Sequence, residues 1–215
     1  MRKLIHLSVG FPKAMEFGDN QTMETGICKE AVDIAFLAKG GFQGDSVANT
    51  KYHGGPDRAV CIYPYEHYSM WGQEFGLQLP PAAFGENVTV THMTEHDVCL
   101  GDIYQIGEAV IQVTQGRIPC DTISKRLNIP TILSRIVETG YTGYLCRVLT
   151  EGYVRKESPI KLLRQHPAQI SVLYANEVYF LRPKDAEAME KILEVEELAD
   201  VWREKLRARL HALKK

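Results

Sequence analysis

Short hydrophobic runs separated by glycine-containing turns dominate the first three quarters of the chain. Runs of this kind predict β-strands, and they are found at 3–9, 59–63, 88–91 and 103–114, the last with a hairpin turn at Gly107–Glu108. Many short strands joined by glycine-rich turns favour a barrel or a sandwich. The pattern therefore predicts a mainly β fold.

Three other segments between these runs carry weaker or different signals. Residues 11–25 are polar, contain glycine and show no clear period, so they are expected to form a long loop. Residues 65–75 follow Pro64 and are expected to form a helix, with Tyr68 and Trp71 at helical spacing. Residues 144–149 and 153–154 are expected to form a closing hairpin around Glu151–Gly152.

The pattern becomes helical after Pro159. A helix is expected over 171–180, and Pro183 and Asp185 are start signals for a second. A last helix carries an apolar stripe formed by Leu198, Val201, Trp202, Leu206 and Leu210. The chain is therefore predicted to divide into a β domain, residues 1–162, and a three-helix unit, residues 163–215. If the stripe is not fully buried inside the chain, a homodimer is plausible.

Composition adds mainly exclusions. The 215 residues are 45% hydrophobic and 24% charged, with a formal net charge of -2. No basic excess supports binding to nucleic acid or to a membrane surface. No apolar run approaches the roughly 20 residues of a membrane span, and the first residues lack the cleavage site of a signal peptide. The cytoplasm is the expected compartment.

The cysteines are expected to be free thiols. They are five in number and widely spaced: Cys28, Cys61, Cys99, Cys120 and Cys146. No C-x-x-C pair is present, so a structural zinc site is not expected. Neither an iron–sulfur spacing nor a flavin or Rossmann fingerprint is present. Most free cysteines are small buried hydrophobes.

Cys120 stands out among them by its position. It follows a strand, Arg117 and Pro119, and it precedes Asp121–Thr122, which are good N-cap types for a short helix through Leu127. Positive partial charge at a helix N-terminus favours a thiolate, which is both a nucleophile and a soft metal ligand. The alternative is an ordinary buried loop cysteine, and from local context alone this alternative is favoured.

The stretch KYHGGPDRA, residues 51–59, is the second candidate. Gly54 and Gly55 can adopt positive φ and turn backbone N–H groups toward an anion. Lys51, His53 and Arg58 would add charge around it. The alternative is a tight turn with solvated basic side chains, and as physics alone this alternative is favoured. Arg147, on the strand predicted after Gly143–Tyr144, is a weak candidate by itself.

Taken together, several strings resemble the MOSC family, the domain found at the C-terminus of molybdenum-cofactor sulfurases, and within it the bacterial YiiM-like branch. The matching strings are GDSVANTKYHGGPDRAVCIYPYEHYSMW (44–71), FGENVTV (84–90), GDIYQIG (101–107), QGRIPC (115–120) and GYTGYLCRVLTEG (140–152). The helical tail looks like the three-helix domain appended in that branch. The resemblance implies a MOSC-type β-barrel with a few peripheral helices, followed by a small C-terminal three-helix unit.

The resemblance also implies a molybdenum–molybdopterin cofactor. Cys120 would be both the molybdenum ligand and the catalytic residue. The cofactor's phosphate-bearing tail would be held by Lys51, His53, Gly54, Gly55, Arg58, Arg117 and Arg147, since arginine pairs two phosphate oxygens at once. The expected reaction is reduction of an N-hydroxylated small molecule from N–OH to N–H. An electron-donating flavoprotein or iron–sulfur protein would be the redox partner.

Two other functions remain open at this point. The chain could be a non-catalytic carrier of the molybdenum cofactor, or of sulfur as a Cys120 persulfide. It could also be a metal-free thiol enzyme with Cys120 as nucleophile and His53 as base. Turnover with an electron donor would separate the reductase from the carrier. Thiol activity retained after removal of molybdenum would favour the thiol enzyme.

Overall fold

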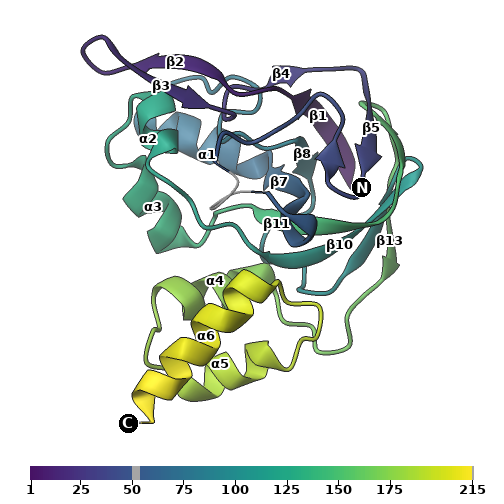
Figure 1. The fold of residues 1–215 in the computed structure, drawn as a ribbon, viewed down its shortest axis with the longest axis vertical. Coiled ribbons are helices and arrows are strands. Elements are labelled where there is room, and N and C mark those ends of the chain that lie inside the picture. Colours follow the sequence, from purple (N-terminus) through teal and green to yellow (C-terminus); the bar gives the residue numbers. More distant parts are fainter. Residues whose placement is uncertain (50–53, 215) are drawn as a thin grey trace.

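A computed structural model describes residues 1–49 and 54–214 of the chain. Its largest element is an eight-stranded sheet that curls into a half-barrel (Figure 1). The strand order across this sheet is β13 (Ile160–Arg164), β9 (Ile103–Ile106), β10 (Ala109–Gly116), β11 (Tyr144–Thr150), β7 (Val60–Pro64), β8 (Val88–Thr91), β1 (Lys3–Val9) and β4 (Glu30–Ala31). The β7–β8 pair is parallel and the other pairs are antiparallel. The predicted mainly β barrel-type fold is confirmed.

Two smaller sheets correct two expectations. Residues 11–25 are not a loop, because β2 (Lys13–Phe17) and β3 (Gln21–Thr25) form a hairpin. Of its strand residues only Met15 and Thr25 are buried, so the alternation along the hairpin is too weak to reveal the strands. β12 (Gly152–Arg155) does not pair with β11 as expected. It pairs with β5 (Ile34–Ala38), which also pairs with β6 (Gly41–Phe42).

Three helices cover one side of the half-barrel (Figure 1). They are α1 (Glu66–Phe75), α2 (Thr122–Leu127) and α3 (Ile132–Thr139). α1 confirms the helix predicted after Pro64 and ends at Gly76, which is left-handed with φ 66°. These helices bury a hydrophobic cluster that includes Trp71, Phe84 and Ile132, all 0% exposed. The cluster fixes the direction in which the chain leaves β10.

The three predicted C-terminal helices are confirmed as α4 (Val172–Phe180), α5 (Ala186–Leu193) and α6 (Asp200–Leu213). Ser171 caps α4 by accepting the Tyr174 amide at 3.1 Å, and Asp185 caps α5 by accepting the Ala188 amide at 3.0 Å. The unit lies beneath the half-barrel, with α4 against β10 (Figure 1). β13 contains residues on both sides of the predicted boundary at 162, so the division of the chain stays a prediction.

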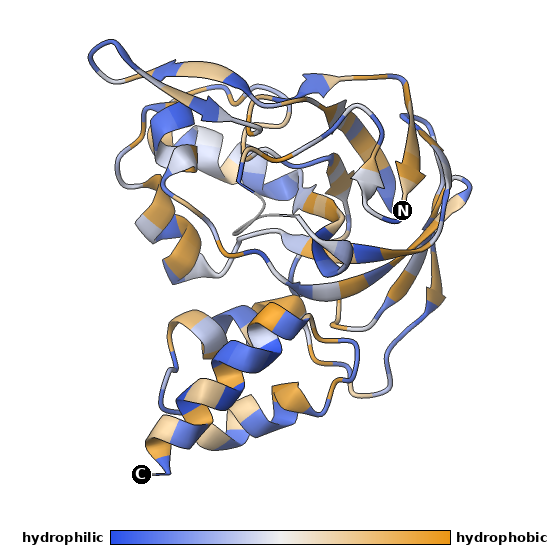
Figure 2. Ribbon diagram, in the orientation of Figure 1, coloured by the Kyte–Doolittle hydropathy of each residue, from blue (hydrophilic) through white to orange (hydrophobic). Residues whose placement is uncertain are grey.

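The hydrophobic core runs without a break from the half-barrel into the helical unit. It joins Ile111 and Val113 of β10 to Trp202 and Leu206 of α6, all of them 0% exposed. Hydrophobic and hydrophilic residues alternate along α6 (Figure 2), as a one-sided apolar stripe requires. Most residues of that stripe are buried within the protomer. The homodimer stays a prediction. Within the described ranges, no helix combines the length and apolarity needed to cross a membrane.

Replacement of Trp202 by alanine tests this shared core. Trp202 stacks on Tyr179 with ring centroids 4.3 Å apart. Its removal leaves a large cavity, and we expect the free energy of unfolding to fall by about 3–5 kcal/mol in urea denaturation. Leu213→Ala is the control on the same helix, because Leu213 is 41% exposed and should lose far less. Equal small losses in both variants would contradict a core shared between the two parts.

Candidate functional site

Cys120 lies in the connection between β10 and α2. The Arg117 amide donates to the Gly143 carbonyl at 3.0 Å, and the Ile123 amide donates to the Cys120 carbonyl at 3.1 Å. Cys120 itself is half-buried. The connection is therefore held at both ends, while its cysteine side chain keeps some access to solvent.

The start of α2 differs in detail from the prediction. Asp121 occupies the N-cap position of the predicted helix, but its side chain makes no capping hydrogen bond in the described part of the chain. Its carboxylate instead pairs with Lys125 at 2.8 Å, and this hydrogen bond lowers the pKa of Asp121. The predicted helix is confirmed, whereas the prediction that the Asp121 side chain caps it is wrong.

A β-bulge sets which way the end of β10 faces. The register of β10 against β11 shifts between Val113 and Gln115, so that Gln115 pairs with Leu145. Leu145 pairs in turn with Cys61 of β7. Paired residues on neighbouring strands share one face of a sheet. Cys61, Leu145 and Gln115 therefore line the same face, two residues before Arg117.

Arg117 follows directly after the end of β10 and brings a positive charge close in sequence to Cys120. Burial lowers the pKa of its guanidinium, but Cys61, Cys120 and Glu86 raise it by more, so the pKa lies above its ordinary value. Both cysteine side chains are thus near one guanidinium. Nη1 of Arg117 is buried and has no hydrogen-bond partner among the described residues. A buried donor of this kind is costly unless a ligand or water satisfies it.

Gln115 provides a second unsatisfied atom. The side chain is 1% exposed, and its Nε2 donates to the Gly116 carbonyl at 3.0 Å. Its Oε1 is buried and accepts no hydrogen bond from residues that the structure describes. A donor on Arg117 and an acceptor on Gln115 thus lie three and five residues before Cys120. Orphaned atoms of opposite kinds are typical of a ligand site.

Glu86 supplies a buried negative charge to this region. It is 0% exposed, and it accepts hydrogen bonds from the hydroxyl groups of Tyr68 and of Thr89, the latter at 2.8 Å. Burial and the Glu86 carboxylate raise the pKa of Tyr68, which therefore stays a neutral donor. Glu86 also acts electrostatically on Arg117 and Arg126. Glu86 thus offsets part of the buried positive charge.

The Gly54–Arg58 loop docks beside the end of β10. Gly54 and Gly55 have φ 75° and 95°, which confirms the predicted positive φ. The Arg58 amide donates to the Gly55 carbonyl at 2.9 Å, and Thr114 Oγ1 donates to the Asp57 carbonyl at 2.6 Å. The structure therefore brings the loop next to β10, close to the Cys120 connection. Lys51 and His53 lie outside the described residues.

Arg147 makes contacts that the sequence did not predict. Its Nη2 lies 2.8 Å from Asp57 Oδ1 and donates to the Glu197 carbonyl at 3.0 Å. Asp57 Oδ2 also accepts the Asp200 amide at 3.3 Å. Arg147 thus ties the Gly54–Arg58 loop to the helical unit. Direct binding of phosphate by Arg147 stays a prediction.

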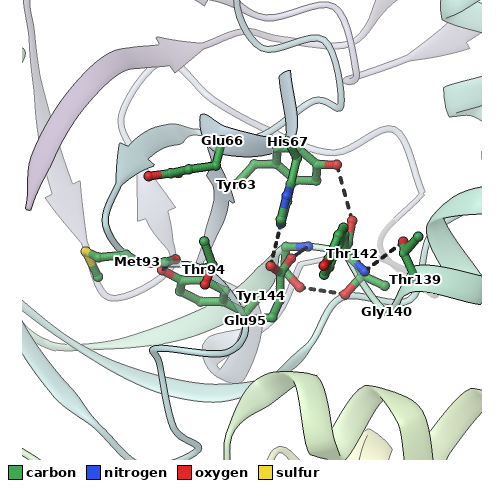
Figure 3. Close-up of polar contacts among 12 residues, drawn as sticks. Tyr63, Glu66, His67, Met93, Thr94, Glu95, Thr139, Gly140, Thr142 and Tyr144 are labelled. Atoms are coloured by element: carbon green, nitrogen blue, oxygen red, sulfur yellow. Dashed lines mark hydrogen bonds and ion pairs between the residues drawn. The ribbon is translucent and has the colours of Figure 1, made fainter. Parts of the chain in front are cut away.

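The turn at residues 140–143 supports the Cys120 connection, because its Gly143 carbonyl accepts the Arg117 amide. Figure 3 shows the residues around this turn. Glu95 Oε1 accepts the Gly143 amide at 2.6 Å, and Glu95 Oε2 lies 2.6 Å from His67 Nε2. His67 stacks on Tyr141 with centroids 4.3 Å apart. Both side chains are almost fully buried. His67 is thus structural, and its partner Glu95 fixes Gly143, whose carbonyl accepts the Arg117 amide.

Sequence reasoning missed several residues of this site, among them Cys61, Gln115, Glu86, Asp57 and Asn176. Cys61 and Gln115 are placed by strand register, and Glu86 lies in an otherwise apolar buried segment. An acidic residue inside a predicted buried segment is a usable signal, because buried carboxylates are almost always paired. The remaining contacts join segments that are distant in sequence.

Comparisons with known proteins agree with this fold and site. Residues 49–161 match the MOSC domain, and residues 170–212 match the YiiM-like 3-alpha helix domain. YflK of Bacillus subtilis (strain 168) is 40% identical over 93% of this chain and 90% of that protein. The crystal structure of YiiM from Geobacillus stearothermophilus has a TM-score of 0.84 at 33% identity, covering 98% of this chain and 100% of that one.

A third relative carries a functional name. A protein named reductase, from Gibberella moniliformis (strain M3125 / FGSC 7600), is 36% identical over 66% of this chain, but the match covers 26% of that protein. The chain belongs to the MOSC domain family. Within that family, its C-terminal helices assign it to the YiiM-like branch.

Alkylation of Cys61 tests the electrostatics of the site. Burial raises the pKa of Cys61, and the Arg117 charge lowers it by less. A free thiol has a pKa of about 8.5. We therefore expect labelling of Cys61 by iodoacetamide, followed by peptide mass spectrometry, to be slow at pH 8 and still accelerating above pH 9. A free cysteine peptide is the control. A Cys61 rate that levels off below pH 8 would contradict this arrangement.

Proposed function

We propose that this chain is an oxidoreductase that binds a molybdenum–molybdopterin cofactor through Cys120 and reduces N-hydroxylated compounds. Membership of the MOSC family supports the cofactor, and the relative named reductase supports the class of reaction. The observation that carries the proposal is the half-buried Cys120 near Arg117, whose buried Nη1 has no partner in the described ranges.

The residues present fit such a cofactor. A cysteine thiolate is a soft ligand that suits molybdenum in a sulfur-rich environment. Arg117 would bind the phosphate or pterin through its unpaired Nη1. The Gly54–Gly55 backbone, with both φ angles positive, can direct amide groups toward an anion, and Arg58 would add charge. Lys51 and His53 are proposed for the same task.

Arg147 has a proposed positioning role in this scheme. Its ion pair with Asp57 holds the loop that carries the two glycines. A loop fixed before the ligand binds loses less conformational entropy on binding. Arg147 would therefore favour cofactor binding through Asp57, in addition to any direct contact with phosphate.

The proposed reaction needs an external source of electrons. Reduction of an N–OH group to N–H takes up two electrons and two protons and releases water. The cofactor, when bound, would supply the centre that accepts the oxygen and passes on the electrons. An electron-donating flavoprotein or iron–sulfur protein would return them. The residues of this chain would bind the cofactor, orient it and hold the substrate beside Cys120.

Cofactor content and turnover in a Cys120→Ala variant test the proposal together. Proteins are purified from cells that synthesise the cofactor, and molybdenum, pterin and the reduction of an aryl hydroxylamine by reduced viologen are measured. Loss of the ligand should lower molybdenum content by about tenfold or more and abolish turnover. Cys99→Ala is the control, because Cys99 is a buried thiol at the junction with Ser171.

The other functions predict different results. Molybdenum bound through Cys120 without turnover of any N-hydroxylated compound would favour the carrier. Cys120-dependent thiol chemistry in molybdenum-free protein would favour the thiol enzyme. Equal molybdenum content in wild type and Cys120→Ala would contradict ligation by Cys120.

A further inference from the structure

The C-terminal helical unit reaches the Cys120 connection through one buried side chain, Asn176. We propose that Asn176 is a positioning residue that sets the conformation of the connection from Arg117 to Cys120. The helical unit would then be a working part of the site. This inference rests on the proposed function only in taking Cys120 as the reactive thiol.

A continuous chain of hydrogen bonds links Asn176 to Arg117. Asn176 is 0% exposed, and its Nδ2 donates to the Gly140 carbonyl at 2.7 Å and to Thr142 Oγ1 at 3.0 Å. Thr142 Oγ1 donates in turn to the Gly143 carbonyl at 2.7 Å. The same carbonyl accepts the Arg117 amide at 3.0 Å. Asn176 therefore orients the acceptor that holds the start of the connection.

Asn176 also touches the connection directly. A Cβ atom built on Gly116 would lie 1.7 Å from Asn176 Oδ1 and 2.8 Å from its Cγ. The carboxamide therefore packs against the backbone of Gly116, one residue before Arg117. No side chain fits at position 116 unless Asn176 gives up its place and, with it, its two hydrogen bonds.

Glu95 provides a second tie between the helical unit and this turn. The Leu173 amide, in the first turn of α4, donates to the Glu95 carbonyl at 2.8 Å. The Glu95 carboxylate accepts the Gly143 amide at 2.6 Å. Figure 3 shows Glu95 beside Gly140 and Thr142 of this turn. α4 thus holds the turn both through Asn176 and through Glu95.

Packing alone does not explain why a side-chain amide occupies position 176. Asn176 Oδ1 is buried and has no hydrogen-bond partner in the part of the chain that the structure describes. A buried acceptor without a partner destabilises the folded state, and an apolar side chain of similar size would avoid that cost. The two donated hydrogen bonds are what an apolar residue could not supply, and both go to the turn that holds Arg117.

Amide exchange and thiol labelling in molybdenum-free full-length protein test the proposal. In Asn176→Ala, we expect the Arg117 amide to exchange with deuterium about fivefold faster, the factor that corresponds to one lost hydrogen bond. Cys120 should become more reactive toward iodoacetamide relative to Cys28 of the same molecules. Cys28 is also half-buried and serves as an internal reference.

Val178→Ala is the matched control for stability. Val178 lies on the same helix and is 0% exposed, but it belongs to the hydrophobic core and carries no polar atom on its side chain. It should lower the thermal midpoint while leaving the Arg117 exchange rate and the relative Cys120 reactivity unchanged. A merely structural role for Asn176 would make the two variants behave alike.

A double-mutant cycle with Gly116→Ala tests the direct contact. Gly116→Ala alone should displace Asn176 and reproduce the changes of Asn176→Ala. In the Asn176→Ala background, the same substitution should have little further effect, because the clashing atoms are gone. If Gly116→Ala does not fold, Thr142→Val interrupts the same hydrogen-bond chain and should also accelerate exchange of the Arg117 amide.

The proposal would be overturned if Asn176→Ala and Thr142→Val both left the Arg117 exchange rate and the Cys120 reactivity as they are in the wild type. Equal effects of Gly116→Ala with and without Asn176 would overturn the direct contact. These readouts need no molybdenum, so they are independent of the proposed function. A protein that shows the expected changes but never binds molybdenum would support the positioning role while contradicting the cofactor.

Discussion

The buried carboxylate of Glu95 is the group on which the geometry of the site depends. It accepts the Gly143 amide at 2.6 Å and lies 2.6 Å from His67, and its backbone carbonyl accepts the Leu173 amide at 2.8 Å. One residue therefore joins α1, the turn after α3 and the helical unit. The Gly143 carbonyl of that turn accepts the Arg117 amide. Glu95 thereby fixes the position of the turn relative to α1 and to the helical unit.

The charges around Cys61 and Cys120 are unequal. Lys29 and Asp45 form a nearly buried ion pair of their own beside Cys61. Arg117 and Arg126 both interact electrostatically with Glu86. Among the described residues, Glu86 is the one carboxylate that acts on both arginines. The excess is positive and only partly compensated. Under the proposed function, the phosphate of the cofactor would complete this balance.

The sequence predicted the features that depend on a local pattern of residues. The strand, arginine, proline, cysteine and helix order located Cys120, and helical periodicity with capping residues located the C-terminal helices. The hairpin at residues 13–25 was missed because one of its faces is exposed and the other fully buries only Met15 and Thr25. The electrostatic interaction of Arg117 with Cys61 and the contact of Asn176 with the turn depend on strand register, a bulge and packing between distant segments, which no local pattern encodes.

X-ray absorption at the molybdenum edge tests the central claim most directly, because it counts the sulfur atoms bound to the metal. It would be measured on cofactor-loaded wild type and on Cys120→Ser that retains residual molybdenum. If Cys120 ligates molybdenum, the wild type will show one more sulfur neighbour than the variant, beyond those of the pterin dithiolene. The same number of sulfur neighbours in both proteins would contradict the assignment of Cys120 as the metal ligand.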